Sequence, residues 1–335
     1  MRIAVIGAGS WGTALSQVLA GNGHEVGLWA RKQEVVRSIN EERRNPRYLS
    51  DVELREGIAA TDSYEDALQR AQAAVIVTPS SLMRDVARRL ARLAGDGLPI
   101  VICSKGVEEG SGLLPVEVFE AEMGGAHRLA ALSGPNHAEE VVRGVPSGTV
   151  IASSSEQTAA LFQEVFASES FRTYTSDDVR GVELCAAFKN VIAIAVGVSY
   201  GLGFGDNTAA MLMTRGLAEM SRLVARAGGR ALTCMGLAGA GDLVATCTSE
   251  HSRNRRFGRL VAEGGTLADF TAQTHMVAEG ALACKTLAVL SARYDVELPI
   301  TDVVRSVVWE GADPLELARA LTSRPLTTEF HGLSV

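Results

Sequence analysis

The sequence has no surplus of positive charge. Its 32 Lys and Arg residues are outnumbered by 39 Asp and Glu residues, which gives a formal net charge of -7 and a pI near 5.5. Proteins that bind nucleic acids or anionic membranes through a broad basic surface have the opposite balance. We therefore expect no nucleic-acid partner, and any anion site must be built from a few local residues.

Paired cysteines are also lacking. The five cysteines form no CxxC pair, and their spacing to the six histidines is not that of metal ligands. We interpret them as reduced thiols packed in the interior, so the sequence predicts neither a disulfide framework nor a metal site. Reduced thiols are typical of the cytosol, and we expect a cytoplasmic protein. The cysteines are Cys103, Cys185, Cys234, Cys247 and Cys284.

Long apolar runs and a secretion signal are missing as well. A membrane-spanning helix needs about 20 apolar residues, and the most apolar run, residues 191–198, is much shorter. The N-terminus enters a strand-like run at once, without the apolar region and cleavage site of a signal peptide. We therefore expect no integral membrane segment. With 335 residues, 47% of them hydrophobic, the chain is long enough for two domains.

The first candidate site is a glycine motif near the N-terminus. The motif GAGSWG follows a hydrophobic strand-like run and precedes a segment with helical periodicity. In this context Gly7 permits a tight turn, Gly9 permits close approach of a pyrophosphate, and Gly12 permits the helix to pack on the strand. The helix N-terminus would offer backbone N–H groups to the phosphates. The motif therefore predicts dinucleotide binding, with Ser10 and Trp11 beside the cofactor.

The expected second strand, residues 24–30, is not followed by an acid. NAD-specific proteins usually carry an Asp or Glu at this place, where its carboxylate bonds the ribose hydroxyls. Here Arg31 and Lys32 occupy the position, and their charges suit a 2′-phosphate. We therefore expect NADPH as the cofactor, with NADH as a second option. The alternative is that the two basic residues only begin an exposed helix.

Strand-like and helical segments alternate up to about residue 178, a pattern typical of a Rossmann-type α/β domain. In an open parallel sheet, the residues that follow strand carboxyl ends line the ligand crevice. Lys105 follows one such strand, and Gly134, Asn136 and Ala138 follow another, so we expect them at the same edge as Gly9. For Lys105 the alternative is a lysine in a surface loop.

The second half of the chain has a different character. Strand-like runs almost disappear after residue 178, and helical periodicity dominates. We place a domain boundary near residue 180, with a dinucleotide-binding Rossmann-type domain at 1–180 and an all-α substrate-binding domain at 181–335. Within the second domain, Asp206 and Asn207 follow a glycine-rich turn and are expected to cap a helix.

A long apolar segment, residues 181–200, contains Lys189 and Asn190. A helix here would be largely buried, and burial of an ammonium group is unfavourable unless an anion compensates the charge. Enzymes use such lysines for proton transfer near neutral pH, which makes Lys189 a candidate catalytic residue. The ordinary alternative is a lysine that reaches solvent, or that pairs with Glu183 or a distant carboxylate.

Two polar clusters follow in this hydrophobic half. Asp242 and Thr246 lie one helical turn apart, facing the same way, after a flexible glycine segment. Ser252, Arg253 and Asn254 stand at an expected helix start, where backbone N–H groups, a hydroxyl, an amide and a guanidinium could hold a phosphate together. An exposed basic turn is the alternative for this second cluster.

The last candidate is the segment VAEG, residues 277–280. A carboxylate from Glu279 near a nicotinamide ribose or amide would fit a dehydrogenase. Helix capping explains the same residue equally well.

Together these segments resemble the NAD(P)-dependent glycerol-3-phosphate dehydrogenases of the bacterial type. The resemblance implies a Rossmann-type domain followed by a helical domain. It also implies reduction of dihydroxyacetone phosphate to sn-glycerol 3-phosphate for phospholipid synthesis. The matching segments cover the chain from end to end: GAGSWGTAL, NPRYL, KGVE, SGPNHAEEV, FKNVIAIAVGVSYGLGFGDNTAA, TRGLAEM, GLAGAGDLVATCTSEHSRNRRFG and VAEG.

The resemblance also implies roles for single residues, and it makes Lys189 the proton donor and acceptor. The residues implied around the substrate are Lys105, Asn190, Asp242, Ser252, Arg253 and Asn254, with Gly134 and Asn136 beside it. The residues implied at the cofactor are Ser10, Trp11, Arg31, Lys105, Ala138, Arg253, Val277 and Glu279.

The chain departs from the family pattern at two places. Asn136 and His137 stand where the family usually has Ser and Phe, so Asn136 is the substrate contact that the pattern supports least. Ser50 and Arg55 stand where the family commonly has prolines, which affects only the shape of that loop.

Two other functions remain open on the sequence alone. A related dehydrogenase acting on a hydroxy acid would bind a carboxylate at residues 252–254. A non-catalytic dinucleotide sensor would keep the glycine motif but would not need a buried Lys189. Activity that depends on the phosphate of the substrate separates these functions. The oligomeric state is also open, a homodimer being one option.

Overall fold

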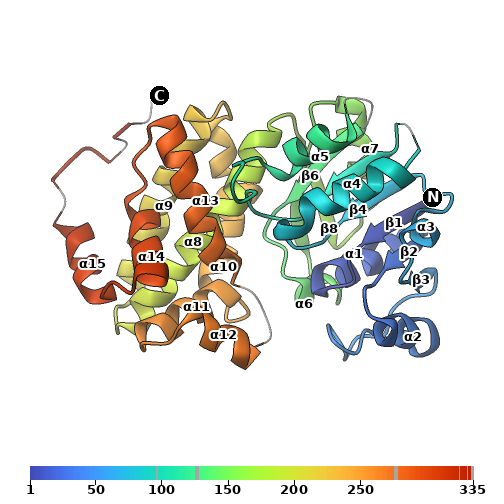
Figure 1. Ribbon diagram of the computed structural model, residues 1–335, viewed down its shortest axis with the longest axis horizontal. Helices are drawn as coiled ribbons and strands as arrows, with labels where there is room; N and C mark the ends of the chain where they lie inside the picture. Colours follow the sequence, from blue (N-terminus) through green and yellow to red (C-terminus); the bar gives the residue numbers. More distant parts are fainter. Residues whose placement is uncertain (96, 125–127, 275–277, 324, 330, 333–335) are drawn as a thin grey trace. The chain divides into compact units, whose positions relative to one another are not determined.

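The computed structural model describes residues 1–95, 97–124, 128–274, 278–323, 325–329 and 331–332. The chain forms two compact units, and Figure 1 labels the helices and strands of each. The first unit consists of Met1–Lys105 and Leu113–Val179, and the second of Gly106–Gly112 and Arg180–Val335. The second unit therefore includes a short segment from the first half of the sequence.

An eight-stranded sheet forms the centre of the first unit. The strands are β1 (Arg2–Ile6), β2 (Glu25–Trp29), β3 (Ile58–Thr61), β4 (Ala73–Ile76), β5 (Pro99–Ile102), β6 (Arg128–Ser133), β7 (Ser147–Ala152) and β8 (Phe171–Ser176). Their order is β3-β2-β1-β4-β5-β6-β7-β8, and all neighbours are parallel except β6 and β7. The order reverses direction between β1 and β4, and open α/β sheets bind ligands at the carboxyl ends beside such a switch point.

Helices cover both faces of this sheet. Along β1, Ile3 and Val5 pack on one face while Ala4 and Ile6 pack on the other, because successive side chains of a strand alternate. The first face is covered by α1 (Ser10–Gly21), α2 (Gln33–Glu42), α6 (Ala138–Val141) and α7 (Glu156–Phe166). The second face is covered by α3 (Tyr64–Leu68), α4 (Met83–Leu93) and α5 (Pro115–Met123), and the short turn η1 (Ser80–Leu82) precedes α4. The predicted Rossmann-type fold is confirmed.

All the regular elements that the structure describes in the second unit are helical, which confirms the predicted all-α character. They are α8 (Val179–Gly201), α9 (Asp206–Arg226), η2 (Ala231–Met235), η3 (Leu237–Gly241), α10 (Asp242–Thr248), α11 (Arg253–Ala262), α12 (Leu267–Thr274), α13 (Glu279–Tyr294), α14 (Pro299–Glu310) and α15 (Pro314–Thr322).

Helix α8 is the apolar core helix of this unit. At 23 residues it is longer than the apolar run 191–198, and by length and composition alone it could cross a membrane. In the folded chain 89% of its most apolar window is buried inside the protein. Its hydrophobic surface is therefore used for packing, which is the ordinary role of such a helix in a core.

Helix α7 lies between β7 and β8, and Ser155 caps its N-terminus. One detail differs from the sequence prediction. Asp206 and Asn207 do not cap α9, because the N-cap residue is Gly205. Asp206 is instead the first helical residue, and its carboxylate accepts a hydrogen bond of 2.8 Å from the hydroxyl of Tyr200.

Candidate active site

The glycine turn between β1 and α1 has the geometry that a dinucleotide site requires. Gly7 has a φ of +122°, which L residues rarely adopt, and a Cβ there would lie 2.8 Å from the carbonyl oxygen of Val77. A Cβ on Gly12 would lie 1.8 Å from the carbonyl oxygen of Gly7, so α1 can approach β1 only because position 12 is glycine. Among the described residues, and apart from Gly9 itself and its chain neighbours, no atom lies within 4 Å of a Cβ added to Gly9. Open space thus remains where a pyrophosphate is expected.

Polar atoms without partners follow the carboxyl ends of the strands. The hydroxyl oxygens of Thr78 and Ser133 and the Oδ1 of Asn136 are buried and have no hydrogen-bond partner among the described residues. Thr78 comes two residues after β4, Ser133 ends β6, and Asn136 lies in the turn that follows β6. Buried polar groups are normally hydrogen-bonded, so these atoms fit a site that a polar ligand completes. The first unit therefore fits a bound dinucleotide.

The residues predicted beside the cofactor lie around this edge. Arg31 is exposed just beyond the carboxyl end of β2, and Lys32 is the half-buried N-cap residue of α2. Ser10 is the first residue of α1. The ring of Trp11 packs against that of Phe171 in β8, with ring centroids 6.3 Å apart. Trp11 therefore helps to fix α1 on the sheet, and its contact with a cofactor stays a prediction.

Asn45 also fixes the glycine turn, and the sequence reading did not single it out. Its side-chain amide donates to the carbonyl oxygen of Ala8 at 3.0 Å and to the Thr13 hydroxyl at 2.8 Å. Its Oδ1 accepts from the backbone N–H groups of Arg47 and Tyr48, both at 3.2 Å. The loop that contains NPRYL is thereby tied to the turn. A single Asn in a polar loop belongs to no helical or strand pattern, so its role could not be predicted from periodicity. Only its place in the NPRYL segment marked it as a candidate.

The structure brings Lys105, Gly134 and Asn136 together, as predicted. The Lys105 ammonium is half-buried and donates to the carbonyl oxygen of Gly134 at 3.4 Å. A Cβ on Gly134 would lie 2.7 Å from the carbonyl oxygen of Gly148, so glycine is needed for β6 and β7 to pass closely. The amide of Asn136 donates to the same Gly148 oxygen at 2.9 Å. Ala138 is buried at the start of α6. Ligand contacts of these residues stay predictions.

Lys189 of α8 is bonded to two residues of α10. Its Nζ lies 2.6 Å from Oδ1 of Asp242 and 2.8 Å from the hydroxyl oxygen of Thr246. The side chains of Lys189 and Asp242 are only 9% and 3% exposed. Lys189 therefore does not reach solvent, and its partner is a carboxylate 53 residues away, one of the alternatives that the sequence left open. We call Lys189, Asp242 and Thr246 the lysine triad.

The lysine triad holds an ammonium group in a fixed position inside an apolar unit. The nearby carboxylate compensates the charge, which makes burial of the lysine possible. Thr246 lies one turn after Asp242, as predicted, and its hydroxyl is 3.3 Å from Oδ1 of Asp242. The sequence identified Thr246 only as a neighbour of Asp242, whereas the structure makes it a direct partner of Lys189. A fixed ammonium can stabilise charge on an oxygen and donate a proton to it.

Asn190 and Asn254 form a second buried polar group beside the triad. The amide of Asn254 donates to Oδ1 of Asn190 at 2.9 Å, and the backbone N–H of Gly280 donates to Oδ1 of Asn254 at 3.0 Å. These bonds fix which way both amides point, so the N–H groups of Asn190 are presented in one orientation. The role of Gly280 was not predicted, because its bond joins α13 to a residue on α11.

The predicted helix start at residues 252–254 is confirmed. Ser252 is the N-cap of α11, and its hydroxyl accepts from the backbone N–H of Arg255 at 3.3 Å. Ser252 and Asn254 are buried, whereas Arg253 is exposed and its guanidinium is accessible to a ligand. A helix N-terminus with an accessible guanidinium is suited to an anion such as a phosphate.

Helices α8 and α11 cross at two glycines. A Cβ on Gly197 would lie 2.1 Å from the carbonyl oxygen of Arg255, and a Cβ on Gly258 would lie 2.2 Å from that of Ile194. The two backbones are therefore in direct contact, which only glycine at both positions permits. This contact brings the start of α11 next to the part of α8 that carries the triad lysine.

The remaining candidates are at the start of α13. Glu279 is its first residue and half-buried, but the N-cap is Ala278, so capping does not account for Glu279. Val277 lies outside the residues that the structure describes. The candidate residues up to Ala138 belong to the first unit, and those from Lys189 onward belong to the second.

The cysteines take no part in this chemistry. All five are free and buried, as the sequence predicted. Burial raises the pKa of the Cys247 thiol to about 12 and that of Cys284 to about 11, which keeps both protonated and unreactive. Among the residues that the structure describes, no three His, Cys, Asp or Glu side chains are grouped to hold a metal ion.

Comparison with known proteins identifies the family. The N-terminal and C-terminal family models of NAD-dependent glycerol-3-phosphate dehydrogenase match residues 2–159 and 178–319. The glycerol-3-phosphate dehydrogenase (NAD(P)+) of Nitratidesulfovibrio vulgaris is 46% identical over 331 residues, which cover 98% of this chain and 100% of that protein. The corresponding protein of Pelotomaculum thermopropionicum is 44% identical over 336 residues, with coverage of 100% and 96%.

A solved structure agrees with these matches. The crystal structure of glycerol-3-phosphate dehydrogenase from Coxiella burnetii superposes with a TM-score of 0.92 at 38% identity, covering 96% of this chain and 99% of that one. The yeast glycerol-3-phosphate dehydrogenase, at 24% identity and a TM-score of 0.82, shares the fold. The sequence, the fold and these relatives together establish that the chain belongs to the NAD-dependent glycerol-3-phosphate dehydrogenase family.

Proposed function

We propose that this protein catalyses the NAD(P)H-dependent reduction of dihydroxyacetone phosphate to sn-glycerol 3-phosphate, a reversible hydride transfer. The observation that carries the proposal is the lysine triad, in which Lys189 is bonded to Asp242 and Thr246 in the interior. A protein that only sensed dinucleotides would have no use for such an ammonium. The relatives at 44 to 46% identity, which are named for this dehydrogenase activity, support the proposal.

Lys189 acts as the general acid in this mechanism. NAD(P)H, when bound, would supply a hydride to the ketone carbon, and negative charge would develop on the carbonyl oxygen. The Lys189 ammonium stabilises that charge and then donates its proton to the oxygen. In the reverse direction the neutral amine accepts the proton of the alcohol. Asp242 and Thr246 hold Nζ in position in both directions.

The start of α11 binds the phosphate of the substrate. Arg253 offers an accessible guanidinium, and the buried Ser252 and Asn254 shape the helix terminus around the anion. Asn190, whose amide is oriented by Asn254, faces the rest of the substrate. Binding energy gained at the phosphate is used to orient the ketone for the transfer.

The first unit would bind the dinucleotide, and three of its residues are proposed substrate contacts. The glycine turn would hold the pyrophosphate, and Arg31 with Lys32 would favour the 2′-phosphate of NADPH while NADH would still be accepted. Lys105 contacts both substrate and cofactor, with Gly134 and Asn136 beside the substrate. The remaining cofactor contacts in this proposal are Gly7, Gly9, Ser10, Trp11, Gly12, Ala138, Arg253, Val277 and Glu279.

The product supplies glycerophospholipid synthesis, and the enzyme works in the cytoplasm. A homodimer is the assembly that we propose, to be checked by light scattering of the purified protein.

A substrate comparison tests the function. We would follow NADPH absorbance with dihydroxyacetone phosphate, with dihydroxyacetone and with a small 2-keto acid. Rapid oxidation of NADPH with the phosphorylated ketone alone is the expected result. Equal rates with and without the phosphate would contradict the proposal, and a faster rate with the keto acid would favour a hydroxy-acid dehydrogenase. NADPH binding without turnover of any of the three would favour a sensor.

A further inference from the structure

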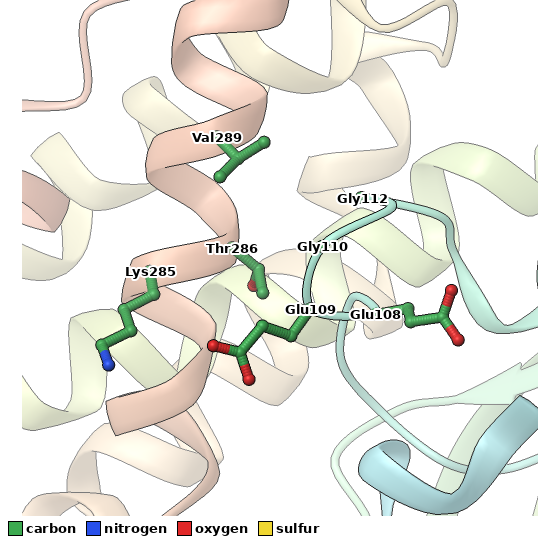
Figure 2. Close-up of a pocket in the computed structure, with 7 residues that line it drawn as sticks. All are labelled: Glu108, Glu109, Gly110, Gly112, Lys285, Thr286 and Val289. Carbon is green, nitrogen blue, oxygen red and sulfur yellow. The ribbon is translucent and has the colours of Figure 1, made fainter.

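The segment that follows Lys105 does not pack with its own half of the chain. The chain leaves the first unit after Lys105, contributes Gly106–Gly112 to the second unit, and returns to the first unit at Leu113. We call residues 106–112 the strap. Figure 2 shows the strap running past α13, with Glu108, Glu109, Gly110 and Gly112 labelled on it.

The strap is bonded to the carboxyl end of α13. The guanidinium of Arg293 donates to the carbonyl oxygen of Ser111 at 2.7 Å. The same guanidinium lies 3.0 to 3.2 Å from the position that a Cβ on Gly112 would take, so a larger residue at 112 would require the guanidinium to shift. Arg293 itself is exposed, and this bond is the contact that orders its long side chain against the strap.

The strap is also folded upon itself. The hydroxyl of Ser111 donates to a carboxylate oxygen of Glu108 at 2.5 Å, and the backbone N–H of Gly112 donates to the carbonyl oxygen of Glu108 at 3.0 Å. One to two turns before Arg293 in α13, Lys285, Thr286 and Val289 line a hollow of about 90 Å³ together with Glu108 and Glu109 (Figure 2). The strap therefore rests on α13 around a small space, and the Arg293 bond fastens its far end.

Glycines stand at both ends of the strap. Gly106 has a φ of +143° and Gly112 a φ of +69°, conformations that L side chains rarely adopt. Lys105 directly precedes Gly106 in the chain, so the path of the strap restrains the backbone from which the lysine side chain extends. A residue that fastens the strap can therefore set the position of Lys105 without touching a ligand.

We propose that Arg293 is a positioning residue for catalysis, which acts by fastening the strap and thereby placing the ammonium of Lys105. The inference rests on the proposed function, in which Lys105 contacts substrate and cofactor. Helix α13 begins with Glu279, another proposed cofactor contact, and fastens the strap at its other end. Helix α13 thus carries a proposed cofactor contact at its first residue and the bond to the strap near its last.

A double-mutant cycle tests this role. Arg293→Ala should lower kcat/KM for dihydroxyacetone phosphate about 10- to 100-fold, the scale of a misplaced catalytic contact. In a Lys105→Ala background the same change should lower kcat/KM less than about twofold, because a residue that acts through Lys105 has nothing left to place. Equal losses in the two backgrounds would overturn the proposal. Arg226→Ala, which removes an exposed arginine at the end of α9, is the matched control and should leave activity unchanged.

Chemical labelling provides a readout that needs no activity. The chain has four lysines, Lys32, Lys105, Lys189 and Lys285, so an amine-reactive reagent followed by mass spectrometry reports on Lys105 individually. Arg293→Ala should raise the labelling rate of Lys105 at least about threefold relative to Lys32, because an unfastened strap frees the lysine. An unchanged rate would overturn the role of Arg293.

The two readouts separate this inference from the proposed function. A wild-type protein without dihydroxyacetone phosphate reductase activity would contradict the function, while the labelling experiment would still decide whether Arg293 positions Lys105. If Arg293→Ala does not fold, Arg293→Lys takes its place. That variant keeps one donor for the Ser111 carbonyl and should show a smaller change of the same kind in both readouts.

Discussion

Replacement of Lys189 by Met separates the chemical role of the lysine from its structural role. The structure shows that this change leaves the Asp242 carboxylate, with a side chain only 3% exposed, beside Thr246 as its remaining partner in the triad. Removing one partner of a buried ion pair typically destabilises a protein by about 3 to 5 kcal/mol. Since folding free energies are about 5 to 15 kcal/mol, the variant should still fold, but with a lower melting temperature.

The double variant Lys189→Met with Asp242→Asn removes both charges and should recover most of the lost stability. It should not recover activity. In both variants kcat for dihydroxyacetone phosphate should fall at least about 100-fold, the usual scale for loss of a general acid. Thermal melting, NADPH titration and initial rates would be measured on the same preparations. A folded Lys189→Met protein with a kcat near that of the wild type would refute the assignment, and Lys105 would become the next candidate.

Three further predictions concern the cofactor, the phosphate and a buried acid. Arg31→Asp should weaken NADPH by about 1.5 to 3 kcal/mol, the worth of a charge-assisted bond, and NADH much less. Binding titrations that show equal losses for the two cofactors would count against a 2′-phosphate contact. Arg253→Ala should raise KM for dihydroxyacetone phosphate and also lower kcat, because remote binding orients the ketone; an unchanged KM would remove Arg253 from the site. Burial raises the pKa of Glu219 from 4.5 to about 8, so between these values the folded protein holds a proton that the unfolded chain releases, and stability falls as the pH rises. Glu219→Gln should therefore melt at the same temperature as the wild type below pH 4.5 and at a higher one near pH 8; equal melting temperatures at both pH values would show that Glu219 is not protonated in the fold.

Patterns with a short sequence range predicted the fold and much of the candidate site. The glycine motif is confined to six residues between a strand and a helix, so its geometry follows from local constraints at Gly7 and Gly12. The burial of Lys189 was likewise visible in the apolar residues around it. Asp242 and Thr246 were recognisable as one face of a helix because they are separated by a single turn.

The missed contacts are those that join distant segments through the backbone. The Asn45 amide donates to the carbonyl oxygen of Ala8, and the backbone N–H of Gly280 donates to Asn254. No periodic pattern in the sequence reveals either hydrogen bond. The cap of α9 was assigned to Asp206 because its residue type favours caps, yet the extended backbone of Gly205 takes that position. The family resemblance pointed to these segments, but it could not show which hydrogen bonds hold them.

The crossing of α8 and α11 determines which changes the site can tolerate. Asn190 precedes Gly197 by two turns of α8, and Asn254 precedes Gly258 by one turn of α11. The contact at the two glycines therefore sets the position of Asn254 relative to Asn190. Sliding α11 along α8 by one residue would move Asn254 by about 1.5 Å, enough to break its 2.9 Å bond to Asn190. The two glycines should therefore be as hard to replace as the proposed substrate contacts Asn190 and Asn254, although neither glycine has a side chain. A redesign for a different substrate can therefore change residues at the starts of the two helices, but it must keep Gly197 and Gly258.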